Sequence, residues 1–218
     1  MVLPRPDLEA LGITYRRIPL LAIGKDVYAD SSAVIDIIQS TLVGLPTSPA
    51  DKAYEAWGNL VFQEVLSIIP KAALAPDFVK DRQTIFPIVK RPDFESLRPS
   101  GLAELKSRCA ELENQFLTNG TFIGGDKISL ADVHVVWAIR WAMNDLGAAQ
   151  EPGLGKDAFP KLWKLIERLP PAKPPVVSSE EALKTINQGD YSSKALEVPK
   201  DDSIGISAGT QVSIESRE

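Results

Sequence analysis

The segment 129–146 constrains the fold more than any other part of the chain, because it is apolar on most of its sides. Its large apolar residues are Leu130, Val133, Val136, Trp137, Ile139, Trp141 and Leu146. A helix that is hydrophobic nearly all round has to be covered by other elements, and it normally lies at the centre of a domain. The segment therefore predicts a helical domain built around one buried helix.

Ser129 and Asp132 mark where this helix is expected to begin. The Ser129 hydroxyl can accept the backbone N–H of Asp132, and the Asp132 carboxylate can accept the N–H of Ser129, which together make a capping box. Ile128 and Val133 have the spacing of the hydrophobic staple that often accompanies such a box. We expect these residues to have a structural role.

Residues 50–170 as a whole are expected to form the helical domain. A linker, Leu45-Pro46-Thr47-Ser48-Pro49, precedes it. Helical spacing then recurs in three further runs: Tyr54, Trp57, Leu60, Val61, Val65 and Ile68; Leu102, Leu105, Cys109, Leu112 and Phe116; and Phe159, Leu162, Trp163, Ile166 and Leu169. We expect a loop rich in Pro, Arg and Phe to interrupt the bundle around 76–100.

Residues 171–218 are interpreted as a separate tail. It opens with the proline-rich spacer at 170–175, which favours a stiff extended chain. Residues 179–186 are compatible with one more helix. Beyond them, aliphatic residues alternate with small or polar ones, which indicates a hairpin with nothing nearby to pack on: Ile204, Ile206, Val212 and Ile214.

Residues 1–44 show patterns of short elements. Pro6 and the acids after it predict a short helix over about 7–11. Residues 18–23 and 27–29 predict two strands around a turn, and Asp30 or Ser31 is placed to cap a following helix. This order of elements is that of the C-terminal half of a thioredoxin-like unit. The predicted fold class is therefore α/β plus all-α: a partial thioredoxin-like unit at 1–44, a helical domain at 50–170 and an irregular tail.

The composition excludes several classes of function. The net charge of −5 and the pI near 5.1 argue against a broad nucleic-acid interface. No apolar run reaches the ~18 to 20 residues of a transmembrane helix, and charges and prolines occupy the place of a signal-peptide core. The single cysteine, Cys109, excludes an internal disulfide and a cysteine-based zinc site. We expect a cytoplasmic protein that contacts neither membrane nor nucleic acid.

Some reactive residues have a plain structural interpretation. His134 lies inside the apolar helix and is expected to be an interior histidine with its hydrogen bonds satisfied. Cys109 falls on the apolar stripe of its own helix and is expected to be a core residue. Four basic residues around the predicted loop allow either a basic rim over a cleft or a solvated loop, and we favour the loop: Arg82, Lys90, Arg91 and Arg98.

Ile18-Pro19 places a proline inside an apolar run, and two interpretations stay open. A proline removes a ladder donor and is normally confined to strand edges and special bends. A cis bond here would turn the backbone N–H and C=O of Ile18 toward a ligand. The alternative is an ordinary trans proline at a strand entry.

Asp30-Ser31 also leaves two interpretations open. The orphan N–H groups of a helix start suit a carboxylate. The Ser31 hydroxyl could add a hydrogen bond to that carboxylate, and Asp30 could pair with an amino group. A γ-glutamyl end carries both a carboxylate and an amino group. The alternative is plain N-capping.

The order of these features resembles the glutathione S-transferase family over about residues 3–170. The resemblance is carried by Ile18-Pro19-Leu20-Leu21, by Asp30-Ser31-Ser32-Ala33-Val34-Ile35, by the proline linker and helices, and by Phe122-Ile123-Gly124-Gly125-Asp126-Lys127-Ile128-Ser129-Leu130-Ala131-Asp132. The run Leu3-Pro4-Arg5-Pro6-Asp7-Leu8-Glu9, with Leu11-Gly12-Ile13 and Tyr15-Arg16-Arg17-Ile18-Pro19, further resembles a fungal branch of these proteins. The last stretch is similar to the family's capping box at its buried helix.

The resemblance implies a glutathione site with glutathione as co-substrate. Ile18 would bind the cysteinyl backbone beside a cis Pro19, and Asp30 and Ser31 would hold the γ-glutamyl end. The implied reaction is attack of the glutathione thiolate on a small electrophile, in fungal secondary metabolism or detoxification. A homodimer is a further expectation.

The chain also departs from the family pattern. The family's first strand, helix and second strand have no counterpart here, and neither does the hydroxyl or thiol that lowers the glutathione pKa. Tyr15 and Tyr28 lie beyond that strand, so no catalytic residue is assigned. We expect a chain truncated at both ends, with an open edge on the strand near Pro19. The alternative function is a degenerate, non-catalytic binding or dimerisation module.

Overall fold

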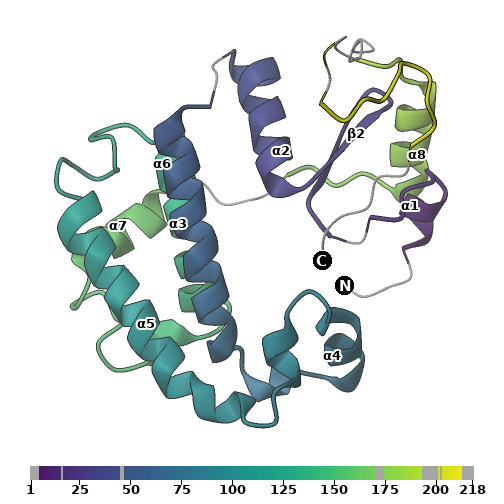
Figure 1. The fold of residues 1–218 in the computed structure, drawn as a ribbon. Helices are drawn as coiled ribbons and strands as arrows, with labels where there is room; N and C mark the ends of the chain where they lie inside the picture. The colour runs from purple at the N-terminus through teal and green to yellow at the C-terminus, as the bar shows by residue number, and fades with distance from the viewer. Residues whose placement is uncertain are drawn as a thin grey trace. The chain divides into compact units, whose positions relative to one another are not determined.

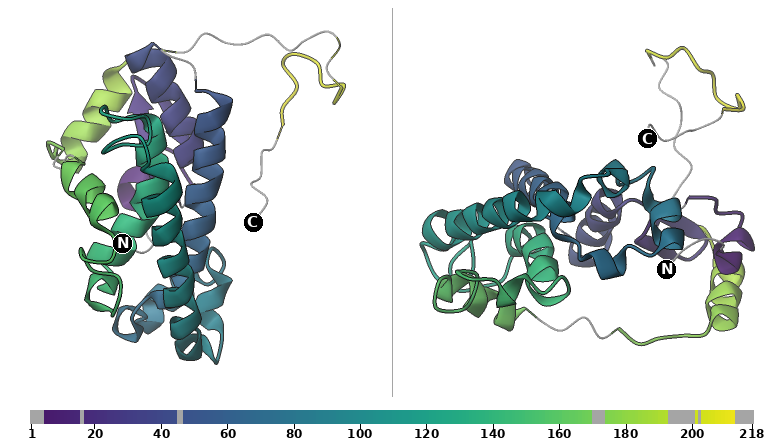
Figure 2. Two further views of the ribbon diagram at one scale, coloured as in Figure 1. Left: turned by 90° about the vertical axis from the view of Figure 1, so that its left-hand side faces the viewer. Right: turned by 90° about the horizontal axis from the view of Figure 1, so that it is seen from below.

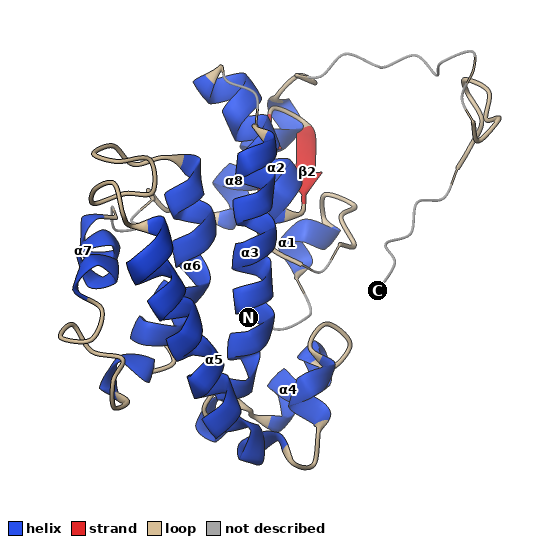
Figure 3. Cartoon of the chain, turned by 60° about the vertical axis from the view of Figure 1, so that its left-hand side comes forward, coloured by secondary structure: helices blue, strands red, loops and turns tan. Residues whose placement is uncertain are grey.

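The computed structural model describes residues 5–15, 17–44, 47–169, 174–192, 201 and 203–212. Over these ranges the protein is mostly helical, with one two-stranded antiparallel sheet (Figure 3). This confirms the expected mixture of elements at a coarse level. The chain divides into a helical unit, Pro46–Pro174 with residues 1–2, and an N-terminal unit, Leu3–Leu45 with Pro175–Glu218.

The helical unit is built on three long helices that lie side by side (Figures 1 and 2). They are α3 (Pro49–Val65), α5 (Arg98–Glu111) and α6 (Leu130–Asn144), and α3 contacts both of the others. The shorter α7 (Pro160–Arg168) completes the unit. Helix α6 buries nine of its residues, which confirms that it is the central helix.

Sequence-local chemistry fixes the start of α3. The Ser48 hydroxyl accepts the N–H of Asp51 at 3.1 Å, and the Asp51 carboxylate accepts the N–H of Ser48 at 2.9 Å. Pro49 occupies the first helical position, where its missing N–H costs nothing. The linker at 45–49 thus ends in a second capping box, although part of it lies outside the described residues.

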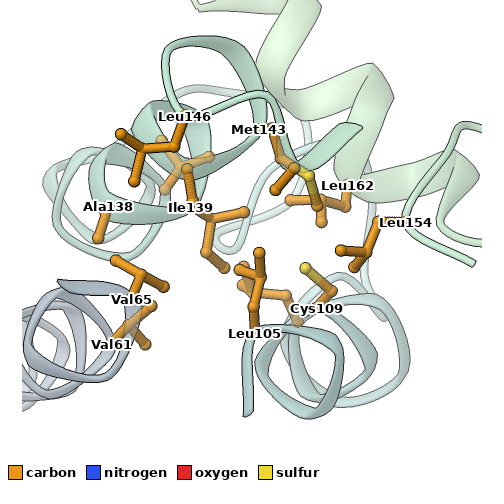
Figure 4. Packing of buried hydrophobic residues seen from close by; sticks show 14 of the residues in the cluster. Val61, Val65, Leu105, Cys109, Ala138, Ile139, Met143, Leu146, Leu154 and Leu162 are labelled. Atoms are coloured by element: carbon orange, nitrogen blue, oxygen red, sulfur yellow. The ribbon is translucent and has the colours of Figure 1, made fainter. Parts of the chain in front are cut away.

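The core of the helical unit is a continuous apolar cluster (Figure 4). Helix α3 contributes Val61 and Val65, while α5 contributes Leu105 and the Cys109 thiol (Figure 4). Side chains of α6 and of the segments after it close over these, among them Ala138, Ile139, Met143, Leu154 and Leu162. Each large side chain removed from water contributes about 1.5–3 kcal/mol, so this cluster dominates the stability of the unit.

The expected loop around 76–100 is wrong in part. The structure places α4 at Pro76–Arg82, single helical turns at Pro87–Lys90 and Phe94–Leu97, and the start of α5 at Arg98. Two of the prolines that suggested a loop stand at or next to the first position of a helical turn, which tolerates proline.

Glu113 connects α5 to α7 across the core. It lies in the π-helical turn Leu112–Phe116 that extends α5, and it is buried. Its carboxylate accepts the backbone N–H groups of Lys161 at 3.1 Å and Leu162 at 2.9 Å. These N–H groups belong to the first turn of α7, where intrahelical acceptors are missing. A side chain 48 residues away therefore caps α7.

The N-terminal unit combines both ends of the described chain. Its elements are α1 (Pro6–Glu9), β1 (Leu20–Ile23), β2 (Asp26–Ala29), α2 (Ser31–Ile37) with a π-helical turn at Ile38–Val43, and α8 (Ser179–Gln188). Strands β1 and β2 form an antiparallel hairpin, as the sequence predicted. Helix α8 corresponds to the helix predicted at 179–186.

Residues 189–192, the C-terminal strap, lie against the turn of this hairpin. Tyr191 forms an antiparallel bridge with Gly24, and the N–H of Lys25 donates to the C=O of Asp190 at 3.1 Å. The Asp26 carboxylate accepts both the N–H and the hydroxyl of Ser192, at 2.7 and 2.6 Å. The chain after α8 is thus joined to the first hairpin of the sequence.

The predicted hairpin in the tail is not formed in the part that the structure describes. Residues 203–212 contain turns and no strand. Ile214, the last residue of the alternating pattern, and most of the spacer at 170–175 lie outside the described residues. The side chains of Ile204 and Val212 are 74% and 56% exposed.

Candidate functional site

The hairpin register brings the two halves of the predicted site together. Leu20 pairs with Ala29 at the open end of the β1–β2 ladder. The residues just outside this pair are Pro19 before β1 and Asp30 after β2. Each is one residue away from a strand pair, and paired Cα atoms lie about 4.5–5.5 Å apart. Ile18-Pro19 and Asp30-Ser31 are therefore neighbours in space.

The Ile18-Pro19 peptide bond is cis, which decides between the two interpretations of that pair. The Ile18 side chain is 55% exposed, and Pro19 is exposed as well. Among the described residues, none forms a hydrogen bond with the backbone N–H or C=O of Ile18. These two groups are available to a ligand backbone.

Asp30 is the residue that caps α2. Its Oδ1 accepts the N–H of Ser32 at 2.9 Å, and its C=O accepts the N–H of Val34 at 2.9 Å. Its backbone has φ 77° and ψ 133°, a region that residues other than glycine rarely enter. Such a conformation costs of order 1–3 kcal/mol and is often found where a binding site requires it. Asp30 therefore combines a helix cap with a strained backbone.

Ser31 occupies the first helical position of α2 and is exposed. Its hydroxyl stands directly beside Asp30 on the chain. The pair presents a carboxylate that accepts hydrogen bonds and a hydroxyl that both donates and accepts. That set fits a group carrying an amine and a carboxylate together.

Cys109 is not part of this site. It lies in the core of the helical unit with no exposed surface. Burial, with a smaller contribution from the charge of Glu113, raises the pKa of its thiol to about 12. The thiolate is therefore unavailable at neutral pH, which confirms the prediction of a core cysteine.

The other reactive residues singled out from the sequence also have structural roles. His134 is 3% exposed within α6, which confirms its interior position. The prediction that it is also fully hydrogen-bonded is not confirmed, because its Nε2 atom is buried without a hydrogen-bond partner among the described residues. The arginines around the short helices are each paired with an acid rather than gathered into a basic rim. Arg91 binds Asp93 through two nitrogens, and Arg98 binds Glu151 at 2.7 Å.

The candidate site is the surface formed by Ile18, Pro19, Asp30 and Ser31. The described part of the chain contains no group of three or more potential metal ligands. None of the helices described combines the length and apolarity needed to cross a bilayer.

The Asp26–Ser192 contact, at the turn end of the hairpin and away from this site, was not anticipated from the sequence. Its partners are 166 residues apart, and neither belongs to a recognisable motif. Gly24 was the available indication, because a glycine in a tight turn allows another backbone to approach closely.

Comparison with known proteins places the helical unit in a family. No curated protein matches the chain. The family described as a domain of unknown function, DUF7962, matches residues 65–175, just over half of the 218 residues. The match begins at the end of α3 and includes α5, α6 and α7, and it leaves the candidate site outside its bounds. The chain belongs to the DUF7962 family.

Proposed function

We propose that this protein is glutathione S-transferase-like and holds glutathione on its N-terminal unit for use on a small electrophile. In this proposal the N-terminal unit is a partial thioredoxin-like unit. The helical unit corresponds to the C-terminal domain of such a transferase. The proposal places the protein in the cytoplasm, where thiols stay reduced.

One observation carries the proposal: the hairpin register makes Ile18-Pro19 and Asp30-Ser31 adjacent. The backbone N–H and C=O of Ile18 would pair with the cysteinyl backbone of glutathione. The Asp30 carboxylate would bind the α-amino group of the γ-glutamyl end, and the Ser31 hydroxyl would bind its carboxylate. Ile18-Pro19 and Asp30-Ser31 are all exposed in the described structure.

The reaction follows from the chemistry of the bound thiol. Glutathione transfers its thiol proton to water, and the sulfur lone pair forms a bond to an electrophilic carbon while the leaving group departs with its electron pair. The nucleophile belongs to the ligand, so the chain's own residues bind and orient it. The proposed role of Ile18, Asp30 and Ser31 is therefore to position glutathione.

Isothermal titration with glutathione and with S-methylglutathione tests this proposal. Both should bind with similar affinity, because the proposed contacts involve the backbone and the γ-glutamyl end and not the sulfur. Ser31→Ala should weaken both by tenfold or more. Asp30→Asn keeps an acceptor for the cap and removes the charge, so it should also weaken binding.

Ser40→Ala is the matched control. Ser40 is an exposed serine in the same unit, and its hydroxyl donates to the C=O of Asp36. Its substitution should leave binding unchanged. The absence of binding at millimolar glutathione, or equal binding by wild type and Ser31→Ala, would overturn the proposal.

A second candidate function is a non-catalytic module that dimerises through the helical unit. The observation that favours it is a set of exposed apolar side chains: Leu60 is 48% exposed, Val133 44% and Trp137 39%. Apolar surface of this kind often marks an association site. Analytical ultracentrifugation separates the two candidates: this function requires a stable dimer that Trp137→Lys dissociates, together with no binding of glutathione.

A further inference from the structure

Arg5 has two buried nitrogen atoms that lack hydrogen-bond partners. Its Nε and Nη1 are shielded from solvent, and neither finds an acceptor among the described residues. No other interaction of this side chain with the described part of the chain balances its charge. Arg5 lies in the N-terminal unit, directly before α1.

This arrangement is unfavourable for the protein alone. A guanidinium stays charged at every physiological pH and offers only donors. Burying donors of a charged group without acceptors costs more than burying neutral ones. Arg5 is half-buried, and two buried donors without acceptors in a folded unit indicate a partner that the polypeptide does not supply.

Other arginines of the chain show what such a side chain normally does. Arg108 binds Glu64 through Nε at 2.9 Å and through Nη2 at 2.7 Å. Arg91 binds Asp93 in the same two-point manner. Paired carboxylate oxygens thus satisfy these guanidinium groups, and an oxyanion is the chemistry that Arg5 lacks.

The backbone of Arg5 is held in place. Its C=O accepts the N–H groups of Leu8 and Glu9, both at 3.1 Å, and the ring of Pro6 restricts the backbone of Arg5, the residue before it. Helix α1 is in turn joined to α8, because the Ser179 hydroxyl donates to the Asp7 carboxylate at 2.7 Å. The guanidinium is therefore carried by a fixed segment.

We propose that Arg5 anchors a binding site for a small oxyanion, a carboxylate or phosphate group, in the N-terminal unit. The site does not depend on the proposed glutathione function. The oxyanion is either a free ion or a carboxylate of a larger ligand, and both present the same oxygen atoms to the guanidinium.

Thermal unfolding in phosphate, with chloride at matched ionic strength as the reference, tests the site. Phosphate should raise the midpoint of wild type progressively with concentration, as binding to the folded state requires. Arg5→Met should lose this response, and Arg5→Lys should keep part of it. Arg168→Met is the control, because Arg168 is an exposed arginine in the helical unit.

Stability without the anion provides an independent readout. Arg5→Met should be at least as stable as wild type in phosphate-free buffer, because it removes two buried donors that have no partner in the described structure. A clear loss of stability there would make Arg5 structural and overturn the proposal. An equal phosphate response in wild type and Arg5→Met, or no response in either, would also overturn it.

Glutathione and its glycyl monoethyl ester distinguish the sources of the oxyanion. If Arg5→Met weakens binding of glutathione but not of the ester, the carboxylate belongs to glutathione. If both ligands bind Arg5→Met as they bind wild type while the phosphate response is lost, the oxyanion is a separate ion. An Arg5-dependent phosphate response in a protein that binds no glutathione would support this site and reject only the glutathione proposal.

Discussion

The carboxylate of Asp132 accepts a hydrogen bond from the backbone N–H of Ile123, nine residues earlier, at 2.7 Å. Its other oxygen accepts the N–H and the hydroxyl of Ser129, both at 2.9 Å. Asp132 is fully buried. One carboxylate thus caps the central helix α6 and also fixes the preceding loop against it.

Asp132→Ala should destabilise the protein by about 3 kcal/mol. The substitution removes the acceptor of three hydrogen bonds and leaves their part-buried donors unsatisfied. Hydrogen bonds to charged groups contribute about 1.5–3 kcal/mol each, and water can partly replace those at part-buried donors. Asp132→Asn keeps one acceptor oxygen and should cost less. Chemical denaturation measures both values.

Asp157→Ala controls for the loss of an acidic residue, because Asp157 is exposed in the same unit. It should change the free energy of unfolding by less than about 0.5 kcal/mol. Similar losses in Asp132→Ala and Asp157→Ala would contradict the assigned role of the buried carboxylate.

The sequence predicted the capping box but not the contact with Ile123. Ser129 and Asp132 lie three residues apart, so local spacing alone indicates their hydrogen bonds. Ile123 reaches Asp132 through the turn in which Phe122 and Gly125 exchange backbone hydrogen bonds. The geometry of that turn depends on packing that no short pattern encodes. The accompanying staple is weak, because Ile128 and Val133 remain 47% and 44% exposed.

Gly24→Ala should release the C-terminal strap from the hairpin. A Cβ at Gly24 would lie 2.1 Å from the C=O oxygen of Asp190, and the φ of +57° disfavours any side chain. The clash involves backbone on both sides, so neither partner can move without breaking the Lys25–Asp190 hydrogen bond. Hydrogen exchange should become faster at the Lys25 amide and across residues 189–192.

Gly12→Ala separates this clash from simple backbone strain. Gly12 has a φ of +72°, and a Cβ there would meet nothing within 4 Å. Each substitution should cost about 1–2 kcal/mol for the left-handed conformation. Only Gly24→Ala should accelerate exchange in the strap, and acceleration in both variants would show that the strap is not held by this close approach.

Residue types identified the candidate site, whereas hairpin geometry brought its parts together. Pro19 in an apolar run and Asp30 before a helix are visible in the sequence. The cis bond was one of two interpretations, and the positive φ of Asp30 was not foreseen, although aspartate enters that half of the map more readily than most residues. Their adjacency depends on the Leu20–Ala29 register. The Asp26–Ser192 contact depends on tertiary packing across the whole chain, which local patterns do not specify.

Gly58→Ala should destabilise the helical unit although alanine favours helices. A Cβ at Gly58 would lie 2.0 Å from the C=O oxygen of His134, where α3 crosses α6. Alanine gains about 1 kcal/mol in helix propensity, but forcing two packed backbones apart costs about 1–3 kcal/mol or more. We expect a net decrease in the free energy of unfolding, measured by chemical denaturation.

Gly155→Ala is the control, because a Cβ there meets nothing within 4 Å, and it should be near neutral. A stabilised Gly58→Ala variant would disprove the close approach.

Cys109 should make the stability of the protein fall as the pH rises from about 9 to about 12. Burial raises the folded-state pKa of its thiol to about 12, while the unfolded thiol keeps the ordinary value of 9.0. Between these values the unfolded chain has released the thiol proton and the folded chain retains it. The unfolded state binds fewer protons in this window, so the free energy of unfolding decreases with pH. Below pH 9 the stability from this group is fully present.

Denaturation curves of wild type and Cys109→Ala across the window isolate the effect, because the tyrosines and lysines that also titrate are common to both. The wild-type curve should fall more steeply, and a thiol reagent at pH 8 should modify Cys109 only after unfolding. Parallel curves, or rapid modification of the folded protein, would contradict the buried position of this thiol.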